Sequence, residues 1–472
     1  MSRPNGRVSG ELFNRTVNVR QAKHEAPTTA RSIGHRLPNR DLPLPRYYGG
    51  PVTTAAVSDA PSLTVRSVPV ADPSAGLVEL LAEPHGVAWS RNGEGLIGWG
   101  TAVRLRCDGP KRFATARRWW DRTVRHSAVR DEVGLPGSGL VAFGAFAYAD
   151  DSQAVSLLTV PEVVLGHRAG QWWVTTVGVD GQLPPPPPDL LAARVSPPGV
   201  LRFADGAQSS AQWEAAVATA VGHINAGLLD KVVLARDLDV RTGDPIDPRW
   251  ALRRLAGRYP SCFTFAVDGL LGATPELLVR VEGRLVTSRV LAGTIRRTGS
   301  LTRDEALAGS LARSSKDLEE HEYAVASVAE ALAEHCTGMN VPEAPFVLHL
   351  PNVMHLATDV TGVVGDGSSA LDLAAALHPT AAVCGTPQGA ANSLIAELEG
   401  MDRARYAGPV GWIAGDGTGE FGIALRSGEL DAGDPCRIRL FAGCGIVADS
   451  DPVDELEESN VKFVPMRDAL DH

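Results

Sequence analysis

The sequence predicts an α+β fold in which large antiparallel β-sheets pack together and helices lie outside them. Residues 61–180 contain short apolar runs separated by Gly, Asp and Ser, a pattern typical of antiparallel strands. Beyond residue 205, segments with helical spacing of apolar residues alternate with strand-like segments. The 472-residue chain, with 44% apolar and 21% charged residues, is also long enough to form a sizeable core.

The N-terminal 60 residues differ in composition from the rest of the chain. Residues 1–50 hold nine Lys and Arg against three Asp and Glu, and their apolar residues show no periodic pattern. Because such a segment buries too little apolar surface to fold, we predict a disordered basic arm over residues 1–60. We divide the remainder into a β-rich lobe at 61–204 and a catalytic region at 205–472.

Charge and hydropathy argue against a nucleic-acid-binding, secreted or membrane-spanning protein. The net charge of −10 argues against a nucleic-acid partner, because nucleic-acid-binding proteins usually carry a basic patch. We find neither a secretory signal core nor an apolar stretch of about 20 residues, so we expect no secretion and no membrane span. Six scattered cysteines without a C-x-x-C pair are expected to be reduced, buried and structural. These features together predict a cytoplasmic protein.

Individual segments within residues 61–204 support their assignment as a β-rich lobe. The runs at 139–148 and 171–177 are apolar and bounded by turn residues, so we predict a strand in each. The five prolines of 184–188 cannot join a strand ladder and indicate an extended linker. A proline-binding partner docking on these residues is the alternative.

The catalytic region begins with a helix followed by a buried strand. Residues 210–224 have helical spacing, with Ser210 predicted as the N-cap and Gly227 as the stop. The apolar run at 231–236 predicts a buried strand. A second long helix is predicted from residue 313 to about residue 336.

Two strand-like segments near residue 415 predict a β-hairpin. They are joined by the glycine cluster of 415–419, which lies between two strands rather than between a strand and a helix, so a tight turn is favoured over a dinucleotide-binding loop. Strand alternation then divides five side chains between two faces. One face carries Phe421, Ile423 and Leu425, and the other carries Glu420 and Arg426.

Two acidic pairs at the starts of predicted helices suggest a metal site. Glu455, Glu458 and Lys462 lie at i, i+3 and i+7 of a C-terminal helix, and Asp317 and Glu320 share the i, i+3 spacing. Either pair alone is most often a solvated helix face. If both pairs meet, like charges about 4 Å apart repel by roughly 4 kcal/mol per pair at an effective dielectric near 20, so a cation is required. Oxygen ligands favour Mg²⁺ over zinc.

An amine and a carboxyl group stand out at the ends of predicted strands. Lys231 precedes Val-Val-Leu-Ala, and Glu276 follows Gly272-Ala-Thr-Pro. The lysine would ordinarily extend its ammonium group to water, and the glutamate would ordinarily be a turn residue. If both face one dry cleft, they could form an acid/base pair.

Beyond these patterns, several motifs match one known family in order along residues 205–465. The chain resembles the chorismate-utilising enzymes, and a looser likeness that includes Gly93-Glu-Gly-Leu-Ile-Gly-Trp-Gly100 is most similar to isochorismate synthases. The matching motifs are Lys231-Val-Val-Leu-Ala-Arg, Gly272-Ala-Thr-Pro-Glu-Leu-Leu, Leu291-Ala-Gly-Thr-Ile-Arg, Lys316-Asp-Leu-Glu-Glu-His, Asn352-Val-Met-His-Leu, His378-Pro-Thr-Ala-Ala-Val-Cys-Gly, Arg405-Tyr-Ala-Gly-Pro-Val-Gly-Trp and the stretch from Phe441 to Lys462.

The resemblance implies a fold and a set of residue roles. The expected fold is a sandwich of antiparallel sheets with outer helices and an active site in the cleft between them. Lys231 matches the family's water-activating base, and Glu276 matches the acid that protonates the departing hydroxyl group. Glu320 and Glu458 match direct Mg²⁺ ligands, with Asp317 and Glu455 in supporting positions. Substrate contacts are expected at Gly293, Thr294, His355, Ala382, Tyr406, Arg426, Gly443, Gly445 and Lys462.

The implied reaction is the Mg²⁺-dependent conversion of chorismate into isochorismate, feeding menaquinone or siderophore biosynthesis, by a protein expected to be a monomer. Ala292 stands where aminodeoxychorismate synthases commonly carry a nucleophilic lysine, which disfavours that branch. Salicylate synthase, which adds pyruvate elimination, is the alternative. That branch tends to carry a threonine near Ala382, so the alanine favours a reaction that stops at isochorismate. A non-catalytic chorismate-binding protein is a second alternative.

Overall fold

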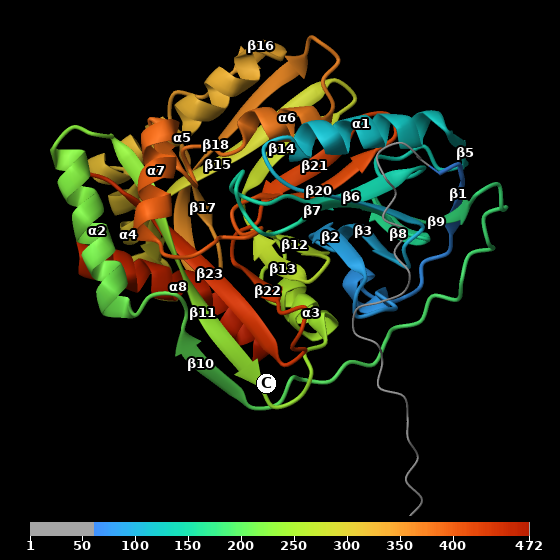
Figure 1. Ribbon diagram of the computed structural model, residues 1–472, viewed down its shortest axis with the longest axis horizontal. Helices are drawn as coiled ribbons and strands as arrows, with labels where there is room; N and C mark the ends of the chain where they lie inside the picture. Colours follow the sequence, from blue (N-terminus) through green and yellow to red (C-terminus); the bar gives the residue numbers. More distant parts are fainter. Residues whose placement is uncertain (1–60, 472) are drawn as a thin grey trace, which may run out of the picture. The chain divides into compact units, whose positions relative to one another are not determined.

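A computed structural model describes residues 61–471 of the chain (Figure 1). The described residues belong to one compact unit. The predicted basic arm at 1–60 lies outside them. Among the described residues, no helix is both long and apolar enough to cross a membrane.

Two large sheets form the framework. Every pairing between described strands is antiparallel except that of β1 with β5. The first sheet has 13 strands, in the spatial order β10 (Leu201–Asp205), β11 (Lys231–Thr242), β23 (Arg437–Ile446), β22 (Ser427–Leu430), β13 (Leu270–Thr274), β12 (Phe263–Val267), β2 (Val87–Arg91), β3 (Glu94–Trp99), β8 (Val163–Arg168), β9 (Gln171–Val179), β1 (Leu63–Val70) and β5 (Ser127–Asp131), with β19 (Gly385–Thr386) paired to β11.

The second sheet has ten strands, and its order again mixes distant parts of the chain. Its strands are β16 (Cys336–Asn340), β18 (Val353–Val364), β15 (Leu285–Arg296), β14 (Leu277–Glu282), β21 (Gly419–Ile423), β20 (Pro409–Ala414), β6 (Val141–Ala145), β7 (Ser156–Val160) and β4 (Val103–Cys107), with β17 (Phe346–His349) paired to β18.

Helices cover the outer faces of both sheets (Figure 1). The helices α1, α4, α5 and α6 contact strands of the second sheet, α2, α3 and α7 contact strands of the first, and α8 contacts strands of both. The helices are η1 (Leu77–Leu80, a 3₁₀ turn), α1 (Arg112–Arg125), α2 (Ser210–Asn225), α3 (Pro248–Arg258), α4 (Leu301–Leu311), α5 (Ser315–Ala333), α6 (Ala370–Leu377), α7 (Gln388–Leu398) and α8 (Pro452–Leu470).

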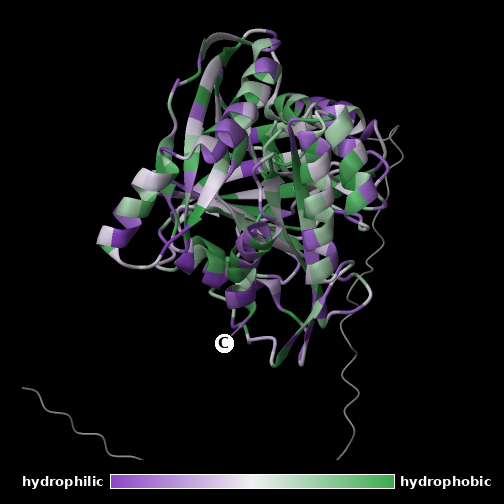
Figure 2. Cartoon of the chain, turned by 90° about the vertical axis from the view of Figure 1, so that its left-hand side faces the viewer, coloured by the Kyte–Doolittle hydropathy of each residue, from purple (hydrophilic) through white to green (hydrophobic). Residues whose placement is uncertain are grey.

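The two sheets pack face to face around an aromatic layer. Trp89 and Trp173 from the first sheet meet Phe143 and Trp412 from the second in one buried cluster. Burial of such large side chains supplies much of the stability of a sandwich. The outer helices mix hydrophilic and hydrophobic residues, which matches their one-sided contact with the sheets (Figure 2). The predicted α+β class is confirmed.

The β-rich lobe and the catalytic region contribute strands to both sheets. In the first sheet, β2 from the lobe pairs with β12 from the catalytic region. In the second sheet, β6 from the lobe pairs with β20. The catalytic strands are therefore held in place by residues from the N-terminal third of the described chain.

The local predictions hold in most places. The hairpin around residue 415 is confirmed as β20 and β21, and helix α8 begins at Pro452 after the N-cap Asp451. The predicted N-cap Ser210 was wrong by one residue, because Ser209 caps α2 by accepting a hydrogen bond from the backbone N–H of Gln212.

Two further predictions need correction. The long helix predicted over 313–336 is shorter, because Ser314 caps α5 at its start and Cys336 already belongs to strand β16. No disulfide joins the six cysteines, which all lie in the described part, but Cys107 and Cys436 are only half-buried. Both lie at or beside strand ends near the surface.

Candidate active site

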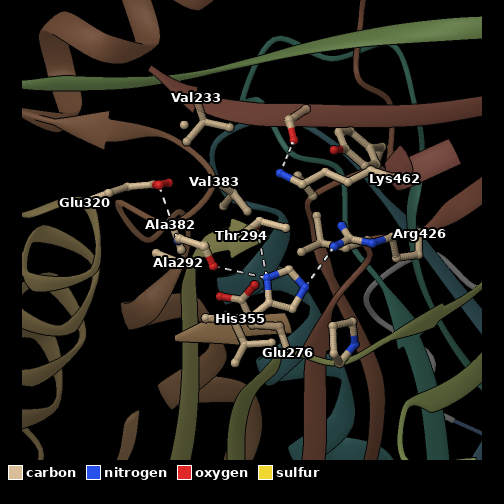
Figure 3. A pocket seen from close by; sticks show the side chains of 18 of the residues that line it. Val233, Glu276, Ala292, Thr294, Glu320, His355, Ala382, Val383, Arg426 and Lys462 are labelled. Atoms are coloured by element: carbon tan, nitrogen blue, oxygen red, sulfur yellow. Dashed lines mark hydrogen bonds between the residues drawn. The ribbon is translucent and has the colours of Figure 1, made fainter. Parts of the chain in front are cut away.

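One polar cavity collects side chains from strands of both sheets and from α5 and α8 (Figure 3). Ten of the eleven residues predicted to be catalytic or to bind substrate line it, and so does Glu320. The ten are Glu276, Gly293, Thr294, His355, Ala382, Tyr406, Arg426, Gly443, Gly445 and Lys462. Residues that lie up to 186 positions apart in the sequence, Glu276 and Lys462, therefore meet at one place.

Glu276 is a buried carboxyl group at the corner between β13 and β14. Only 4% of the surface of this residue is exposed. Burial raises the pKa of Glu276 to about 8, against the opposing effects of a backbone hydrogen bond from Leu291 and the charges of Arg426 and Lys231. At neutral pH this group is therefore mostly the neutral acid, which can give up a proton.

His355 and Arg426 form a hydrogen-bonded pair on the cavity wall (Figure 3). Nη2 of Arg426 lies 3.2 Å from Nε2 of His355, and Nδ1 of His355 lies 3.1 Å from Oγ1 of Thr294. Because a guanidinium group can only donate, Nε2 must accept. Burial and the charge of Arg426 hold the pKa of His355 well below its usual value, which agrees with a neutral ring.

Lys231 is completely buried at the start of β11. Its Nζ lies 3.3 Å from Oε1 of Glu320 and donates to the backbone carbonyl of Glu320 at 3.3 Å. Lys231 is the one predicted catalytic residue that does not line the cavity. The carboxylate of Glu320 lines the cavity instead, and the amine of Lys231 is paired with it. The lysine thus does not extend to bulk water.

The glycine-rich strand β23 allows Glu320 to approach closely. A methyl group added to Gly445 would overlap with Oε1 of Glu320 and would lie 3.2 Å from Cε of Lys231. On β15, the backbone N–H of Gly293 donates to Oε2 of Glu320 at 3.2 Å, and Gly293 has a positive φ of 77°. The absence of a side chain at Gly445 is therefore required to seat this carboxylate, whereas at Gly293 an added methyl group would lie 2.9 Å from Cβ of Asp317.

Lys462 extends from α8 into the same cavity. Its Nζ donates to the backbone carbonyl of Gly443 at 2.8 Å and lies 2.5 Å from Oε1 of Glu458. Burial acts to lower the pKa of Lys462, but the negative charge and hydrogen bond of Glu458 oppose burial, and the pKa is raised. This lysine is a permanent positive charge beside the cavity.

The two acidic helix starts converge as the sequence predicts. Glu455 on α8 accepts a hydrogen bond from Nζ of Lys316 on α5 at 2.7 Å. Burial raises the pKa of Asp317, and the nearby charges of Glu320 and Glu458 raise it further, although a hydrogen bond with Ser314 opposes them. Carboxylates from both helices are thus close enough to repel one another.

This donor set fits a hard divalent cation. The charges of Glu320 and Glu458 act on Asp317, and that of Glu458 acts on Glu455, so the four carboxylates form one acidic cluster, of which Glu320 lines the cavity. Oxygen-rich sites of this kind suit Mg²⁺. The thiol of Cys444 also lies close, with possible ligand atoms of Cys444, Glu455 and Glu458 within 4.8 Å of one another. The thiol donates to the backbone carbonyl of Glu455 at 3.3 Å, and its pKa is raised by burial, so it remains a neutral thiol rather than a ligand.

The comparison with protein families agrees with this geometry. The family described as "Chorismate binding enzyme" matches residues 197–471, which is more than half of the chain. The chain belongs to this chorismate-binding family.

Curated relatives within the family include the "Salicylate biosynthesis isochorismate synthase" of Pseudomonas aeruginosa. It is 34% identical over 412 residues, which cover 81% of this chain and 84% of the relative. The isochorismate synthase EntC of Escherichia coli K12 is 39% identical over 259 residues, or 54% of this chain and 66% of the relative.

Solved structures show how widely the fold is shared. The menaquinone-specific isochorismate synthase MenF from Escherichia coli superposes with a TM-score of 0.72 at 24% identity, covering 88% of this chain and 97% of that one. Anthranilate synthase component I from Streptococcus pneumoniae gives a TM-score of 0.60 at 22% identity, covering 92% and 100%. The fold therefore does not by itself decide which reaction a member of the chorismate-binding family performs.

Several cavity residues carry no sequence signal of their own. Most of the apolar ones lie inside the matched motifs, where no contact with substrate was expected of them, and Arg403 differs because it is charged and lies outside those motifs. Its guanidinium is paired with Glu399 and donates to the backbone carbonyls of Val233 and Val383, each at 2.8 Å. Sequence reasoning did not identify Val233, Pro275, Leu291, Ala292, Val383, Arg403, Ala407 and Leu425 as lining residues.

Proposed function

We propose that this protein is a Mg²⁺-dependent isochorismate synthase that converts chorismate into isochorismate. The observation that carries the proposal is the neutral carboxylic acid of Glu276, which shares a cavity with Arg426 and Lys462 and lies close enough to Lys231 to feel its charge. A buried acid in the cavity and a buried amine directly behind its wall are the two kinds of group that the proton transfers of this isomerisation need.

In the proposed reaction, Lys231 takes a proton from a water molecule that attacks carbon 2 of the ring. The double bond shifts, and the hydroxyl group at carbon 4 leaves as water with a proton from Glu276. One water is added and one is lost, so the product is an isomer of the substrate. The depth at which Glu276 and Lys231 are buried limits competing reactions with bulk water.

The remaining polar groups would bind and orient the substrate. Arg426 and Lys462 supply fixed positive charges for the two carboxylates of chorismate. Gly443 brings a backbone carbonyl to Lys462 at 2.8 Å and so fixes the direction of its ammonium group. The neutral ring of His355 accepts a hydrogen bond from Arg426 and so fixes the position of the guanidinium group.

The metal would be held by Glu320 and Glu458, with Asp317 and Glu455 in support. When bound, Mg²⁺ would supply positive charge that neutralises and orients the ring carboxylate. Glu320 would then contact both the metal and the amine of Lys231, which lies 3.3 Å from Oε1. This contact would hold the amine beside the cavity, where it can accept a proton from water.

The decisive experiment is incubation of the pure full-length protein with chorismate, with and without Mg²⁺, followed by chromatography of the products. Isochorismate formed only with Mg²⁺ supports the proposal. Release of pyruvate would instead indicate a salicylate synthase, and lack of chorismate consumption would reject catalysis. The same experiment with ammonia tests for anthranilate. We further predict a monomeric cytoplasmic enzyme that supplies menaquinone or siderophore biosynthesis.

A further inference from the structure

Three lysines neutralise the acidic edge of the active site. Each lysine comes from a different element, namely β11, α5 and α8, and each pairs with a different carboxylate. The pairs are Lys231 with Glu320 at 3.3 Å, Lys316 with Glu455 at 2.7 Å and Lys462 with Glu458 at 2.5 Å. Three positive charges therefore already occupy an edge that is proposed to hold a divalent cation.

Lys316 differs from the other two lysines because the proposed chemistry gives it no task. It does not line the cavity, whereas Lys462 does, and Lys231 is the proposed base. Its side chain is one-third exposed, while its partner Glu455 is 3% exposed. Lys316 can therefore be altered without removing a group that contacts the substrate.

The pair of Lys316 and Glu455 connects the two helices that carry the acidic groups. Lys316 lies in the first turn of α5, beside Asp317, and Glu455 lies in the first turn of α8. Glu455 is held in place by a second donor, the hydroxyl of Ser450 at 2.7 Å. Both donors bind the same oxygen, Oε1, so one oxygen of this carboxylate is fixed before any metal arrives.

We propose that Lys316 is a built-in counter-ion that stabilises the metal-free acidic cluster and weakens the binding of the divalent cation. This inference rests on the proposed function. Without the lysine, the carboxylates on α5 and α8 would repel one another and destabilise the free enzyme. With the lysine, an incoming Mg²⁺ meets a positive charge close to its own site. The consequence is a metal affinity lower than four carboxylates alone would give.

Replacement of Lys316 by methionine tests this idea. Methionine keeps much of the length and apolar stem but removes the charge. We expect Lys316→Met to bind Mg²⁺ about tenfold more tightly, as expected for removal of one positive charge a few ångströms from a divalent ion. Calorimetric titration of the full-length protein with MgCl₂ measures this affinity without turnover. The melting temperature in EDTA should fall, and the rise on adding Mg²⁺ should be larger than in the wild type.

Two control variants separate the charge from ordinary helix stabilisation. Lys316→Arg keeps the positive charge and should keep the wild-type affinity. Arg297→Met removes a matched ion pair elsewhere, because Arg297 and Asp304 lie 3.0 Å apart and are 25% and 3% exposed. It should lower the melting temperature without changing the Mg²⁺ affinity.

The outcomes distinguish this inference from the proposed function. If the wild type binds Mg²⁺ and converts chorismate, but Lys316→Met binds Mg²⁺ with equal or weaker affinity, the counter-ion role is wrong and the proposed function stands. Lys316 would then only stabilise the helices or position Glu455. If the wild type shows neither Mg²⁺ binding nor chorismate conversion, both are rejected.

Discussion

Arg426 donates a hydrogen bond to Nε2 of His355, which lies 3.2 Å away. This contact fixes the histidine as the tautomer that carries its proton on Nδ1, facing the carbonyl of Gly293 and the hydroxyl of Thr294. Since burial and the charge of Arg426 keep the pKa of His355 well below its usual value, the ring acts as a neutral support for a cationic side chain.

Replacement of His355 by leucine should therefore weaken substrate binding. Arg426 would lose its acceptor inside a dry cavity, and a hydrogen bond to a charged group contributes about 1.5–3 kcal/mol. We expect KM for chorismate to rise at least tenfold, as measured by steady-state kinetics. His355→Gln, which can place an amide oxygen near the position of Nε2, should recover part of the loss. A KM equal to that of the wild type in His355→Leu would show that the pair does not position Arg426.

Removal of the acid at residue 276 should block the chemical step. In Glu276→Gln the side chain keeps its shape but cannot protonate the departing hydroxyl group. General acids typically contribute about 10²–10⁴-fold, so kcat should fall by that amount. Chorismate binding, followed by equilibrium titration, should change much less. Comparable losses in kcat and in affinity would indicate that Glu276 binds substrate rather than donating a proton.

The pKa of Glu276 also predicts how activity depends on pH. Its value of about 8 means that the acid form prevails at neutral pH and disappears as the pH rises through 8. We expect kcat/KM for the free enzyme to fall on the alkaline side with an inflection near 8. His355 should give no inflection near 6.5, because its pKa is well below that value.

The same shift has a consequence for stability. The pKa of Glu276 in the folded protein lies above the ordinary glutamate pKa of 4.5, so the folded state holds this proton more tightly than the unfolded chain does. The resulting stabilisation is fully present below pH 4.5 and is lost as the pH rises through about 8. Melting temperatures of the wild type and Glu276→Gln across this range should therefore diverge, with the variant gaining relative stability at alkaline pH. Parallel curves would contradict the shifted pKa.

A methyl group at residue 445 should disturb the proposed metal site. The added carbon would overlap with Oε1 of Glu320, and the strand backbone of β23 cannot easily retreat because β11 pairs with it. We expect Gly445→Ala to weaken Mg²⁺ binding at least tenfold in calorimetry and to reduce turnover. The matched control is Gly222→Ala in α2, where an added methyl group meets nothing within 4 Å. That variant should be active and slightly more stable.

Features of this protein that arise from neighbouring residues could be predicted from the sequence, whereas contacts between distant segments could be predicted only through the family resemblance. The hairpin at 410–426 follows from alternation and a glycine turn, and both are local. The convergence of the two acidic pairs follows from the family resemblance. No local rule brings together two helices whose acidic residues, such as Glu320 and Glu455, lie 135 positions apart in the sequence.

Other features could not be predicted because they depend on packing. Lys231 lies behind Glu320 rather than in the cavity, and only the packing of the Glu320 side chain against Lys231 and Gly445 determines which of the two lines the cavity. The pairing of Lys316 with Glu455 spans 139 residues and has no periodic signature. The N-cap of α2 was misplaced because two serines are adjacent and only the backbone conformation selects Ser209.

Loss of Glu399 should destabilise the protein strongly. Glu399 and Arg403 form an ion pair whose side chains are 1% and 3% exposed, and Glu399 also accepts the backbone N–H of Ala235 at 2.7 Å. Glu399→Ala would leave a guanidinium buried without its counter-charge, which costs about 3–5 kcal/mol. Because Arg403 also binds the carbonyls of Val233 and Val383, the strand that begins at Lys231 would lose support.

A matched change at an exposed pair provides the control for this last experiment. Arg66 and Glu132 lie 3.2 Å apart but are 49% and 34% exposed, so Glu132→Ala should alter the free energy of unfolding by less than about 1 kcal/mol. Urea unfolding followed by tryptophan fluorescence compares the two variants, and several tryptophans lie in the buried cores. Equal effects of the two substitutions would mean that the buried pair is replaced by water or by a shift of Arg403. A large loss only in Glu399→Ala would establish that pair as a structural support for the strand carrying the proposed base.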